Sequence, residues 1–446
     1  MKFLAREVAN LSSSHLIGDA LITSATFDSR KVKKGSLFIA VRGKNRDGHD
    51  FVPFAVENGA SAVLISKDKA RELLPLIKNR CAIIIAPDPL NALRRFASLR
   101  AASTSATMIG VTGSCGKTTT KEMVYSILSV AHKTKKTPGN LNSEYGLPLS
   151  MLELDKQDEF GVFEIGVDHI GEMAKQASLL SPEHSIITNI GISHLEEFGT
   201  QDAIAREKGG ILLPQSFGYT LKGEKYNSYF KSITRSLEEV TNPFTSVKDL
   251  GLAGFELTLN KEHFIMSTVG MHNLKDASLA VALARKLDIS DCEIAEGLSN
   301  VESIFGRSRV VKEGCVTVIE DCYNATLDSV KDAISTVSRL SWPGKKHIIL
   351  GDMRELGKQS ISAHRTIGYQ LASANCDNIY LYGEEVKETY SVLKRECSGR
   401  KVIYTPDFDI LSDYVRSGAQ GGDLMLLKGS RVMAMERLFP TLRQVV

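Results

Sequence analysis

The sequence has few of the features by which several classes of protein are recognised. Its seven cysteines are an odd number without Cys-x-x-Cys spacing, which argues against a disulfide framework and a zinc site. No uninterrupted apolar run exceeds that of residues 81–86, which is far too short to span a bilayer. Charges interrupt the first apolar stretch, MKFLAREVANLSSSH, so we expect no signal peptide. These absences predict a soluble protein of a reducing cytoplasm without membrane insertion.

The sequence also lacks a large excess of charge of either sign. The 55 Lys and Arg residues nearly balance the 52 Asp and Glu residues, and no basic block stands out, so we expect no nucleic-acid partner. The composition, with 43% hydrophobic and 24% charged residues, is ordinary for a globular protein and excludes a disordered or collagenous chain. A length of 446 residues corresponds to about three domains of roughly 150 residues each.

Three sections differ in character along the chain. The first contains strand-like runs at residues 36–42, 62–66 and 82–86, and Pro87 and Pro89 mark a boundary before a helix over 90–102. The second has strand-like segments at 108–112, 160–165 and 185–188 between helical stretches, a hairpin over 255–269 turning at 260–262, and a helix over 271–287. Such alternation predicts a parallel sheet covered by helices.

The third section starts near Arg309 and alternates again. Its expected strands are residues 316–320, 347–350, 378–382, 401–404 and 423–427, with a helix over 329–340. We therefore predict an α/β protein with a small N-terminal domain (1–87), a central parallel-sheet domain of the P-loop ATPase type (88–308) and a Rossmann-like C-terminal domain (309–446).

The strongest local signal is the segment GVTGSCGKTTT at residues 110–120, placed between a predicted strand and a predicted helix. Glycines let the backbone wrap around phosphate oxygens, and the N–H groups at a helix start attract anions. Lys117 would neutralise terminal phosphates, and Thr118 would offer its hydroxyl to Mg²⁺. The glycine spacing differs from that of a standard P-loop, so a chance Gly-rich turn is the alternative.

Two further residues follow predicted strands of the same sheet. Glu164 lies at the end of the strand 160–165, and His194 follows the strand 185–188, at the edge where such sheets bind ligands. The alternatives are a solvated strand end and a structural histidine. No Asn-Lys-x-Asp motif occurs, so guanine specificity is unsupported.

The phosphate loop resembles the GxTGxxGKT pattern of the Mur ligase family, the ATP-dependent amino-acid ligases of peptidoglycan synthesis, and this resemblance spans essentially the whole chain. It implies three domains that bind a UDP-sugar, ATP and the incoming amino component. It also implies a reaction in which ATP converts a substrate carboxylate to an acyl phosphate, which an amine attacks. Lys117, Glu164, His194 and Lys208 match catalytic positions. Two Mg²⁺ ions are implied, with the ligands Thr118, Glu164, His194 and Lys208, the last of these carbamylated.

The resemblance also implies a set of nucleotide-binding residues. The matching positions are Gly113, Ser114, Cys115, Gly116, Lys117, Thr118, Thr119, Asn273, Arg307 and Asp321. The sequence departs from the family pattern at several positions near them. Asp276 replaces the second Asn of GxHNxxNA, and a carboxylate only accepts hydrogen bonds where an amide also donates. Thr326 and Leu327 stand where the family has Asn-Pro, and Cys115 is an unusual residue for the loop.

Other motifs concern the two remaining substrates. Ser29 and Arg30 in the segment DSR match residues that hold the UDP group, and Asn140 and Asn142 in GNLNSE match residues that hold the muramoyl peptide. The segments DCYNA, GDMRELG and KGSR resemble the branch of the family that adds D-Ala-D-Ala to UDP-MurNAc-tripeptide. Within them, the expected dipeptide-binding residues are Asn324, Lys428 and Ser430.

Several alternatives stay open at this point. A ligase that adds the third residue to UDP-MurNAc-dipeptide is the nearest, although its DYAHTP and DNPR-type signatures are missing. A folate polyglutamate ligase should lack the segments DSR (28–30) and DGH (47–49), both of which this sequence contains. A non-catalytic nucleotide-binding scaffold should lack the complete set of catalytic positions, which is present here. A monomer is the expected state.

Overall fold

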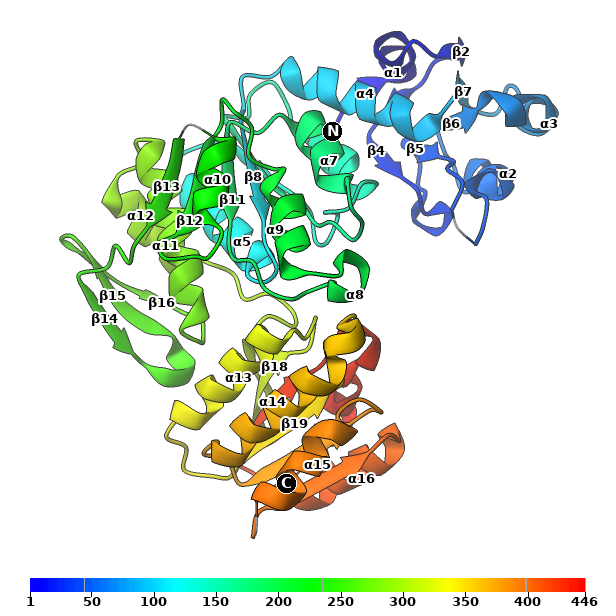
Figure 1. The fold of residues 1–446 in the computed structure, drawn as a ribbon. Helices are drawn as coiled ribbons and strands as arrows, with labels where there is room; N and C mark the ends of the chain where they lie inside the picture. The colour runs from blue at the N-terminus through cyan, green and yellow to red at the C-terminus, as the bar shows by residue number, and fades with distance from the viewer. Residues whose placement is uncertain (44, 235, 398, 446) are drawn as a thin grey trace. The chain divides into compact units, whose positions relative to one another are not determined.

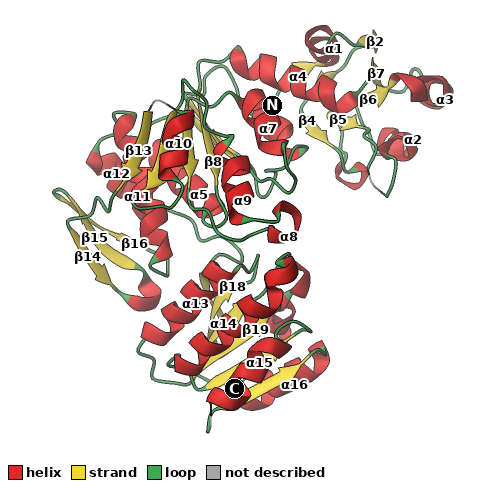
Figure 2. Cartoon of the chain, viewed as in Figure 1, coloured by secondary structure: helices red, strands yellow, loops and turns green. Residues whose placement is uncertain are grey.

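The computed structural model describes residues 1–43, 45–234, 236–397 and 399–445, and the chain folds into two compact units (Figure 1). The first unit comprises Met1–Gly110, His132–Val167 and Glu172–Glu183. The second comprises Val111–Ala131, Asp168–Gly171 and the chain from His184 onward. Helices and strands alternate along most of the chain, as the predicted α/β class requires (Figure 2).

The N-terminal part of the first unit is built on a five-stranded sheet. The strands, in sheet order, are β2 (His15–Ile17), β7 (Ala82–Ala86), β6 (Ala62–Ser66), β5 (Ser36–Ile39) and β4 (Ser24–Thr26). All pairs are parallel except β2–β7, and β5 and β6 are buried along their whole length, as expected for strands covered on both faces. The strands predicted at 36–42, 62–66 and 82–86 are therefore confirmed, although the first ends at Ile39.

Helices surround this sheet. The elements are α1 (Ala5–Ser12), α2 (Val52–Glu57), α3 (Lys67–Ile77), α4 (Pro89–Ala102), the short helices η1 (Ser29–Lys31) and η2 (Gly48–Phe51), and an antiparallel pair of strands, β1 (Phe3–Leu4) and β3 (Leu21–Ile22). The Asp88 carboxylate caps α4 by accepting the N–H groups of Leu90 at 2.9 Å and Asn91 at 3.1 Å. Pro89 occupies the first turn, where its missing N–H costs nothing.

The first unit also holds part of the central region. Its elements are β9 (Thr134–Lys136), α6 (Gly146–Met151), β10 (Phe160–Glu164) and α7 (Glu172–Leu180), and β9 pairs with β10 in parallel. The strand β8 (Thr107–Thr112) begins in this unit, where the Thr107 N–H donates to the Glu159 carbonyl at 2.9 Å. It ends in the second unit, directly before the phosphate loop.

The second unit continues the central region with three parallel strands, β11 (His184–Ile187), β12 (Phe217–Leu221) and β13 (Ser236–Val240). Its helices here are α5 (Lys117–Leu128), α8 (Leu195–Phe198), α9 (Gln201–Gly209), α10 (Asn227–Ile233), α11 (His272–Lys286) and α12 (Asp291–Ser299). The Thr188 N–H donates to the Thr112 carbonyl at 2.9 Å, so the ends of β8 and β11 lie side by side. This parallel arrangement was predicted.

A small antiparallel sheet contains the predicted hairpin. It consists of β14 (Ser246–Asp249), β15 (Phe255–Leu259) and β16 (Glu262–Met266), with the short helix η3 (Gly251–Ala253) between the first two. Leu259 pairs with Glu262, so the turn is only Asn260 and Lys261, shorter by one residue than predicted. Asn260 has a φ of +53°, which asparagine tolerates better than most residues, and this permits the tight turn.

The C-terminal part of the second unit is a six-stranded sheet. Its order is β17 (Arg309–Glu313), β18 (Val316–Asp321), β22 (Leu424–Lys428), β19 (Lys346–Gly351), β20 (Asn378–Tyr382) and β21 (Lys401–Thr405). The last five strands are parallel and correspond to the five predicted, whereas β17 is an antiparallel edge strand that was not expected. The helices are α13 (Leu327–Arg339), α14 (Ser360–Ser373), α15 (Lys387–Glu396), α16 (Phe408–Gly418), α17 (Phe439–Leu442) and the short η4 (Gly357–Gln359), η5 (Arg431–Met433) and η6 (Met435–Leu438).

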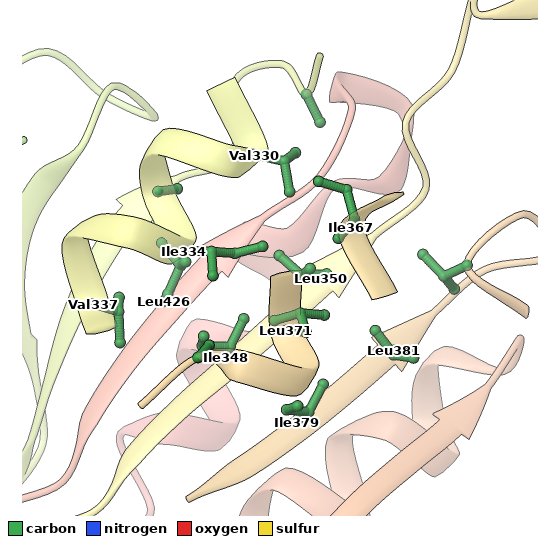
Figure 3. Close-up of a cluster of buried hydrophobic side chains, with 14 of the residues drawn as sticks. Val330, Ile334, Val337, Ile348, Leu350, Ile367, Leu371, Ile379, Leu381 and Leu426 are labelled. Atoms are coloured by element: carbon green, nitrogen blue, oxygen red, sulfur yellow. The ribbon is translucent and has the colours of Figure 1, made fainter. Parts of the chain in front are cut away.

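The core of this sheet explains the position of α13 (Figure 3). Val330, Ile334 and Val337 follow one another at helical spacing, so one face of the helix packs against the sheet. Ile348 and Leu426 from two neighbouring strands belong to the same cluster.

None of the helices in the described part of the chain combines the length and the apolar character needed to cross a bilayer.

Candidate active site

The Gly-rich segment after β8 is held in place by the residues that follow β11. The Asn189 side-chain oxygen accepts the N–H groups of Ser114 at 3.2 Å and Cys115 at 2.9 Å. The Thr188 hydroxyl donates to the Cys115 carbonyl. Thr188 and Asn189 therefore fix the shape of the loop. Sequence reasoning did not identify them, although their position at the carboxyl end of a strand was an available signal.

The glycines of the loop are required by its geometry. Gly113 and Gly116 have φ values of +149° and +79°, which L side chains rarely adopt. A Cβ on Gly113 would overlap the Thr188 hydroxyl, and one on Gly116 would lie 2.5 Å from Asp276 Oδ1. The Lys117 ammonium donates to the Gly113 carbonyl at 2.8 Å, which places its charge at the loop. This backbone and the start of α5 form an anion-binding environment.

A cavity beside the loop collects residues that are far apart in the sequence. Its wall includes residues from the loop, the first turns of α11 and the C-terminal part of the same unit. Ten of the residues predicted to bind the nucleotide or the dipeptide line it, namely Ser114, Cys115, Gly116, Lys117, Thr119, Asn273, Arg307, Asp321, Asn324 and Lys428. The cavity thus joins the phosphate loop to the sheet that contains β22.

Charged residues of the C-terminal part are held toward this cavity. Arg307 donates to the Thr118 hydroxyl at 3.4 Å, and its guanidinium carbon lies 4.3 Å from the centre of the Tyr323 ring. The Lys428 ammonium lies 2.7 Å from Asp321 Oδ2 and donates to the Asn324 carbonyl at 3.0 Å. Lys428 and Asp321 are both buried, so each compensates the charge of the other.

The first turns of α11 carry the residues that match the family pattern GxHNxxNA. The Asn273 amide donates to the Val269 carbonyl at 2.8 Å, so this side chain stabilises the entry into the helix as well as lining the cavity. His272 lines the same wall, and burial lowers the pKa of its imidazole. Asp276 is only 6% exposed, and burial raises the pKa of its carboxyl group to about 8.

Lys208 is a buried lysine near the end of α9. It is 1% exposed, and burial, followed by repulsion from Lys117, lowers the pKa of its amine to about 7. The helix that carries it is capped by Thr200, whose hydroxyl accepts the Ala203 N–H at 3.1 Å. With this pKa about half of the amine is neutral at pH 7, and a neutral lysine can react as an amine.

His194 precedes α8 and contacts the C-terminal part of the chain. Its backbone is left-handed, with a φ of +56°, and its Nδ1 lies 2.8 Å from Glu355 Oε2. This contact lowers the pKa of the Glu355 carboxyl group. Glu355 belongs to the predicted GDMRELG segment, but sequence reasoning gave it no role. The contact restrains the orientation of the imidazole.

The first unit contains Glu164 with its own partners. The Asn142 amide donates to Glu164 Oε1 at 2.7 Å, and the Glu164 N–H donates to the Thr137 hydroxyl at 3.0 Å. Glu164 is 2% exposed, yet its Oε2 has no hydrogen-bond partner within the described residues. A buried carboxylate oxygen left in this way fits a cation. Asn140, two residues before Asn142, is exposed.

The remaining predicted residues lie at the surface or support loops. Arg30 is exposed and pairs with Asp28 at 2.9 Å, and this hydrogen bond lowers the pKa of Asp28 to about 2, while Ser29 beside it is buried. Ser430 is also buried, and its hydroxyl accepts the Arg354 N–H at 2.9 Å. Ser29, Arg30 and Ser430 do not line the cavity beside the phosphate loop.

Known proteins resemble this chain over its full length. Three family models match in order: the Mur ligase family catalytic domain over residues 21–100, the Mur ligase middle domain over 111–284 and the Mur ligase glutamate ligase domain over 306–431. The chain is 36% identical over 434 residues to the UDP-N-acetylmuramoyl-tripeptide–D-alanyl-D-alanine ligase of Treponema pallidum, covering 94% of this chain and 93% of the relative.

Solved structures show the same likeness. MurF from Acinetobacter baumannii superposes with a TM-score of 0.86 at 28% identity and covers 100% of this chain and 99% of its own. The MurF ligase of Thermotoga maritima, solved in complex with ADP, gives a TM-score of 0.79 at 26% identity over 94% of this chain and 97% of its own.

Proposed function

Because the chain belongs to the Mur ligase family, we propose that it joins D-alanyl-D-alanine to UDP-N-acetylmuramoyl-tripeptide at the expense of ATP in peptidoglycan synthesis. The full-length relationship to a ligase of that name supports the choice of substrates. One observation carries the chemistry: a single cavity is lined by the phosphate loop, Arg307, Asp321 and Lys428. This reaction would complete the cytoplasmic pentapeptide precursor, and we propose that a monomer performs it.

The reaction begins with transfer of the γ-phosphoryl group to the terminal carboxylate of the tripeptide, which gives an acyl phosphate and ADP. The amino nitrogen of D-Ala-D-Ala then attacks the acyl carbon, loses a proton and expels phosphate, so that an amide remains. Lys117 and the N-terminus of α5 would hold the phosphates. Gly113, Ser114, Cys115, Gly116 and Thr119 would surround the nucleotide phosphates, and Asn273, Arg307 and Asp321 would hold the rest of the nucleotide.

The proposed ligands of two Mg²⁺ ions are Thr118, Glu164, His194 and Lys208. The unpartnered, buried Oε2 of Glu164 supports this assignment. Among the described residues no group of three or more His, Cys, Asp or Glu side chains could hold a metal ion. In the proposed sites, hydroxyl, carbamate and phosphate oxygens would complete the coordination. Bound Mg²⁺ supplies positive charge that offsets the charge on the transferred phosphoryl group.

The environment of Lys208 supports its carbamylation. Carbon dioxide reacts with a neutral amine, and burial keeps much of the Lys208 amine neutral at pH 7. The product is a carboxylate-like oxygen ligand, which suits a hard cation better than an ammonium group does.

We propose binding roles for the residues outside the cavity as well. Ser29 and Arg30 would bind the UDP group, and Asn140 and Asn142 the muramoyl peptide, with Asn142 also positioning Glu164 through its amide. The dipeptide would be held by Asn324, Lys428 and Ser430. The corresponding domain boundaries remain our predictions: 1–87, 88–308 and 309–446.

Phosphate release from ATP tests the proposal. We expect release with UDP-MurNAc-tripeptide only when D-Ala-D-Ala is present, together with a pentapeptide product identified by mass. Lys117→Met should abolish this release, whereas Lys225→Met, which removes an exposed lysine, should leave it unchanged. Release instead with UDP-MurNAc-dipeptide and a free diamino acid would assign the chain to the third-residue ligases.

A further inference from the structure

Asp276 occupies an unusual position for an acidic residue. It lies in α11 with its carboxyl group directly against Gly116 of the phosphate loop, where a Cβ on the glycine would lie 2.5 Å from Oδ1 and 2.7 Å from Oδ2. The side chain is 6% exposed, and its Oδ2 has no hydrogen-bond partner in the described part of the chain. A carboxylate at this place would oppose any anion bound by the loop, because repulsion is poorly screened in a buried site.

The charges around Asp276 do not offset its burial. Lys275, Arg307 and the Thr120 hydroxyl favour the ionised form, whereas Asp332 disfavours it, and burial exceeds all of these effects. The other titratable groups lining the same cavity are Cys115, Lys117, Glu224, His272, Asp321, Asp328 and Lys428. They include cations and acids alike, so the cavity as a whole does not surround Asp276 with positive charge.

We propose that Asp276 is a positioning residue of the nucleotide site that accepts the nucleotide only in its protonated form, so that binding at alkaline pH takes up a proton from solution. As a neutral acid it offers one O–H donor and one carbonyl acceptor, as an amide does, and brings no negative charge to the phosphate loop. The inference rests on the proposed nucleotide binding and explains how an acidic residue can stand where the family pattern has asparagine.

The proton linkage has a defined sign and size. A bound anion raises the pKa of Asp276 above its value of about 8 in the free protein, so the complex holds more protons than its separated components when the pH is near 8 or above. If the bound form stays protonated, ADP affinity falls by about tenfold from pH 7 to pH 9. Asp276→Asn cannot ionise, so its affinity should stay within about twofold over the same range.

Isothermal titration with Mg²⁺ and ADP at pH 8.5, in two buffers of different ionisation enthalpy, measures the proton uptake. Lys208, whose pKa is about 7, is already neutral at that pH. Because a group with a pKa of about 8 is about three-quarters ionised at pH 8.5, we expect an uptake of up to about 0.8 proton for the native chain and almost none for Asp276→Asn. Asp332→Asn removes an exposed carboxyl group from the same cavity that disfavours ionisation of Asp276, so its uptake should be at least that of the native chain.

The outcomes separate this inference from the proposed function. ADP binding without buffer-dependent heat in the native chain would overturn the role of Asp276 and leave nucleotide binding intact. The same conclusion would follow if Asp332→Asn reduced the uptake as much as Asp276→Asn does. Absence of ADP binding at pH 7 would overturn both proposals. The native chain supplies the decisive comparison itself, so the test does not depend on the folding of a variant.

Discussion

Replacing Lys208 by methionine should stabilise the protein and abolish its activity. Burial lowers the pKa of this amine from 10.5 to about 7. The unfolded chain therefore holds one proton more than the folded chain between these two pH values, and stability rises with pH across that window. One pKa unit corresponds to about 1.4 kcal/mol, so at pH 7 the linked cost is roughly 4 kcal/mol. Methionine carries no charge and has similar length, so it removes this cost.

Urea unfolding provides the assay, with fluorescence of Trp342, the single tryptophan of the chain, reporting on the unit that contains Lys208. In buffer free of carbon dioxide, Mg²⁺ and nucleotide, we expect Lys208→Met to be more stable than the native chain by about 2–4 kcal/mol at pH 7. The difference should shrink by about 2 kcal/mol at pH 9. Between pH 7 and pH 9 the native amine is mostly neutral in the folded chain but still protonated in the unfolded chain, so the native chain gains stability as the pH rises.

The matched control is Lys225→Met, which removes an exposed lysine that pairs with Asp202 at the start of the same helix. Its stability should change little and without this pH dependence, since exposed ion pairs contribute less than about 1 kcal/mol. A Lys208→Met variant that is less stable than the native chain at pH 7 would refute the reasoning. So would a stability difference that stays constant between pH 7 and pH 9.

Two further changes test the architecture of the cavity. Gly116→Ala should weaken ADP binding by more than about tenfold in isothermal titration, because its Cβ would press on Asp276 and its φ is left-handed. Gly139→Ala, which has a positive φ but no atoms within 4 Å of the added carbon, controls for backbone strain alone. Lys428→Met should destabilise the protein by about 3–5 kcal/mol in urea unfolding by leaving Asp321 buried without its partner. Adding Asp321→Asn should recover much of that loss; no recovery would contradict the pairing argument.

Much of the fold could be predicted because its strands are buried. Runs such as residues 82–86 and 424–427 are continuous and apolar, as parallel strands covered on both faces must be, and both strands lie within one residue of the prediction. Two of the strands that were missed carry a different signal. β14 (SVKD) is exposed at every residue, and the edge strand β17 (RVVKE) is mostly half-buried, so neither shows an apolar run.

The candidate site likewise has features that could be predicted from the sequence and contacts that could not. Family membership, the parallel-sheet architecture and the ligase class were predicted from motifs in the sequence, and all three predictions are confirmed. The contacts that position those motifs could not be predicted, because they depend on packing between distant segments. Asn189 supports the loop from the end of another strand, and Glu355 reaches His194 from a residue 161 positions later in the chain.

The departures from the family pattern are also related in space. Cys115 and Thr326 are far apart in the sequence, but the Cys115 sulfur lies 3.0 Å from the Thr326 hydroxyl. The same hydroxyl accepts the Ser329 N–H at 3.3 Å and thereby caps α13. Thr326 therefore links the phosphate loop to α13, the helix that follows β18 of the C-terminal sheet, and Asp276 contacts the next residue of the loop, Gly116. Thr326 and Asp276, which look independent in the sequence, thus contact two consecutive residues of one loop, and the first of these, Cys115, is itself a departure from the family pattern. Because residues that share a partner influence one another, changes at Cys115 and Thr326 should be strongly non-additive in their effect on ADP affinity.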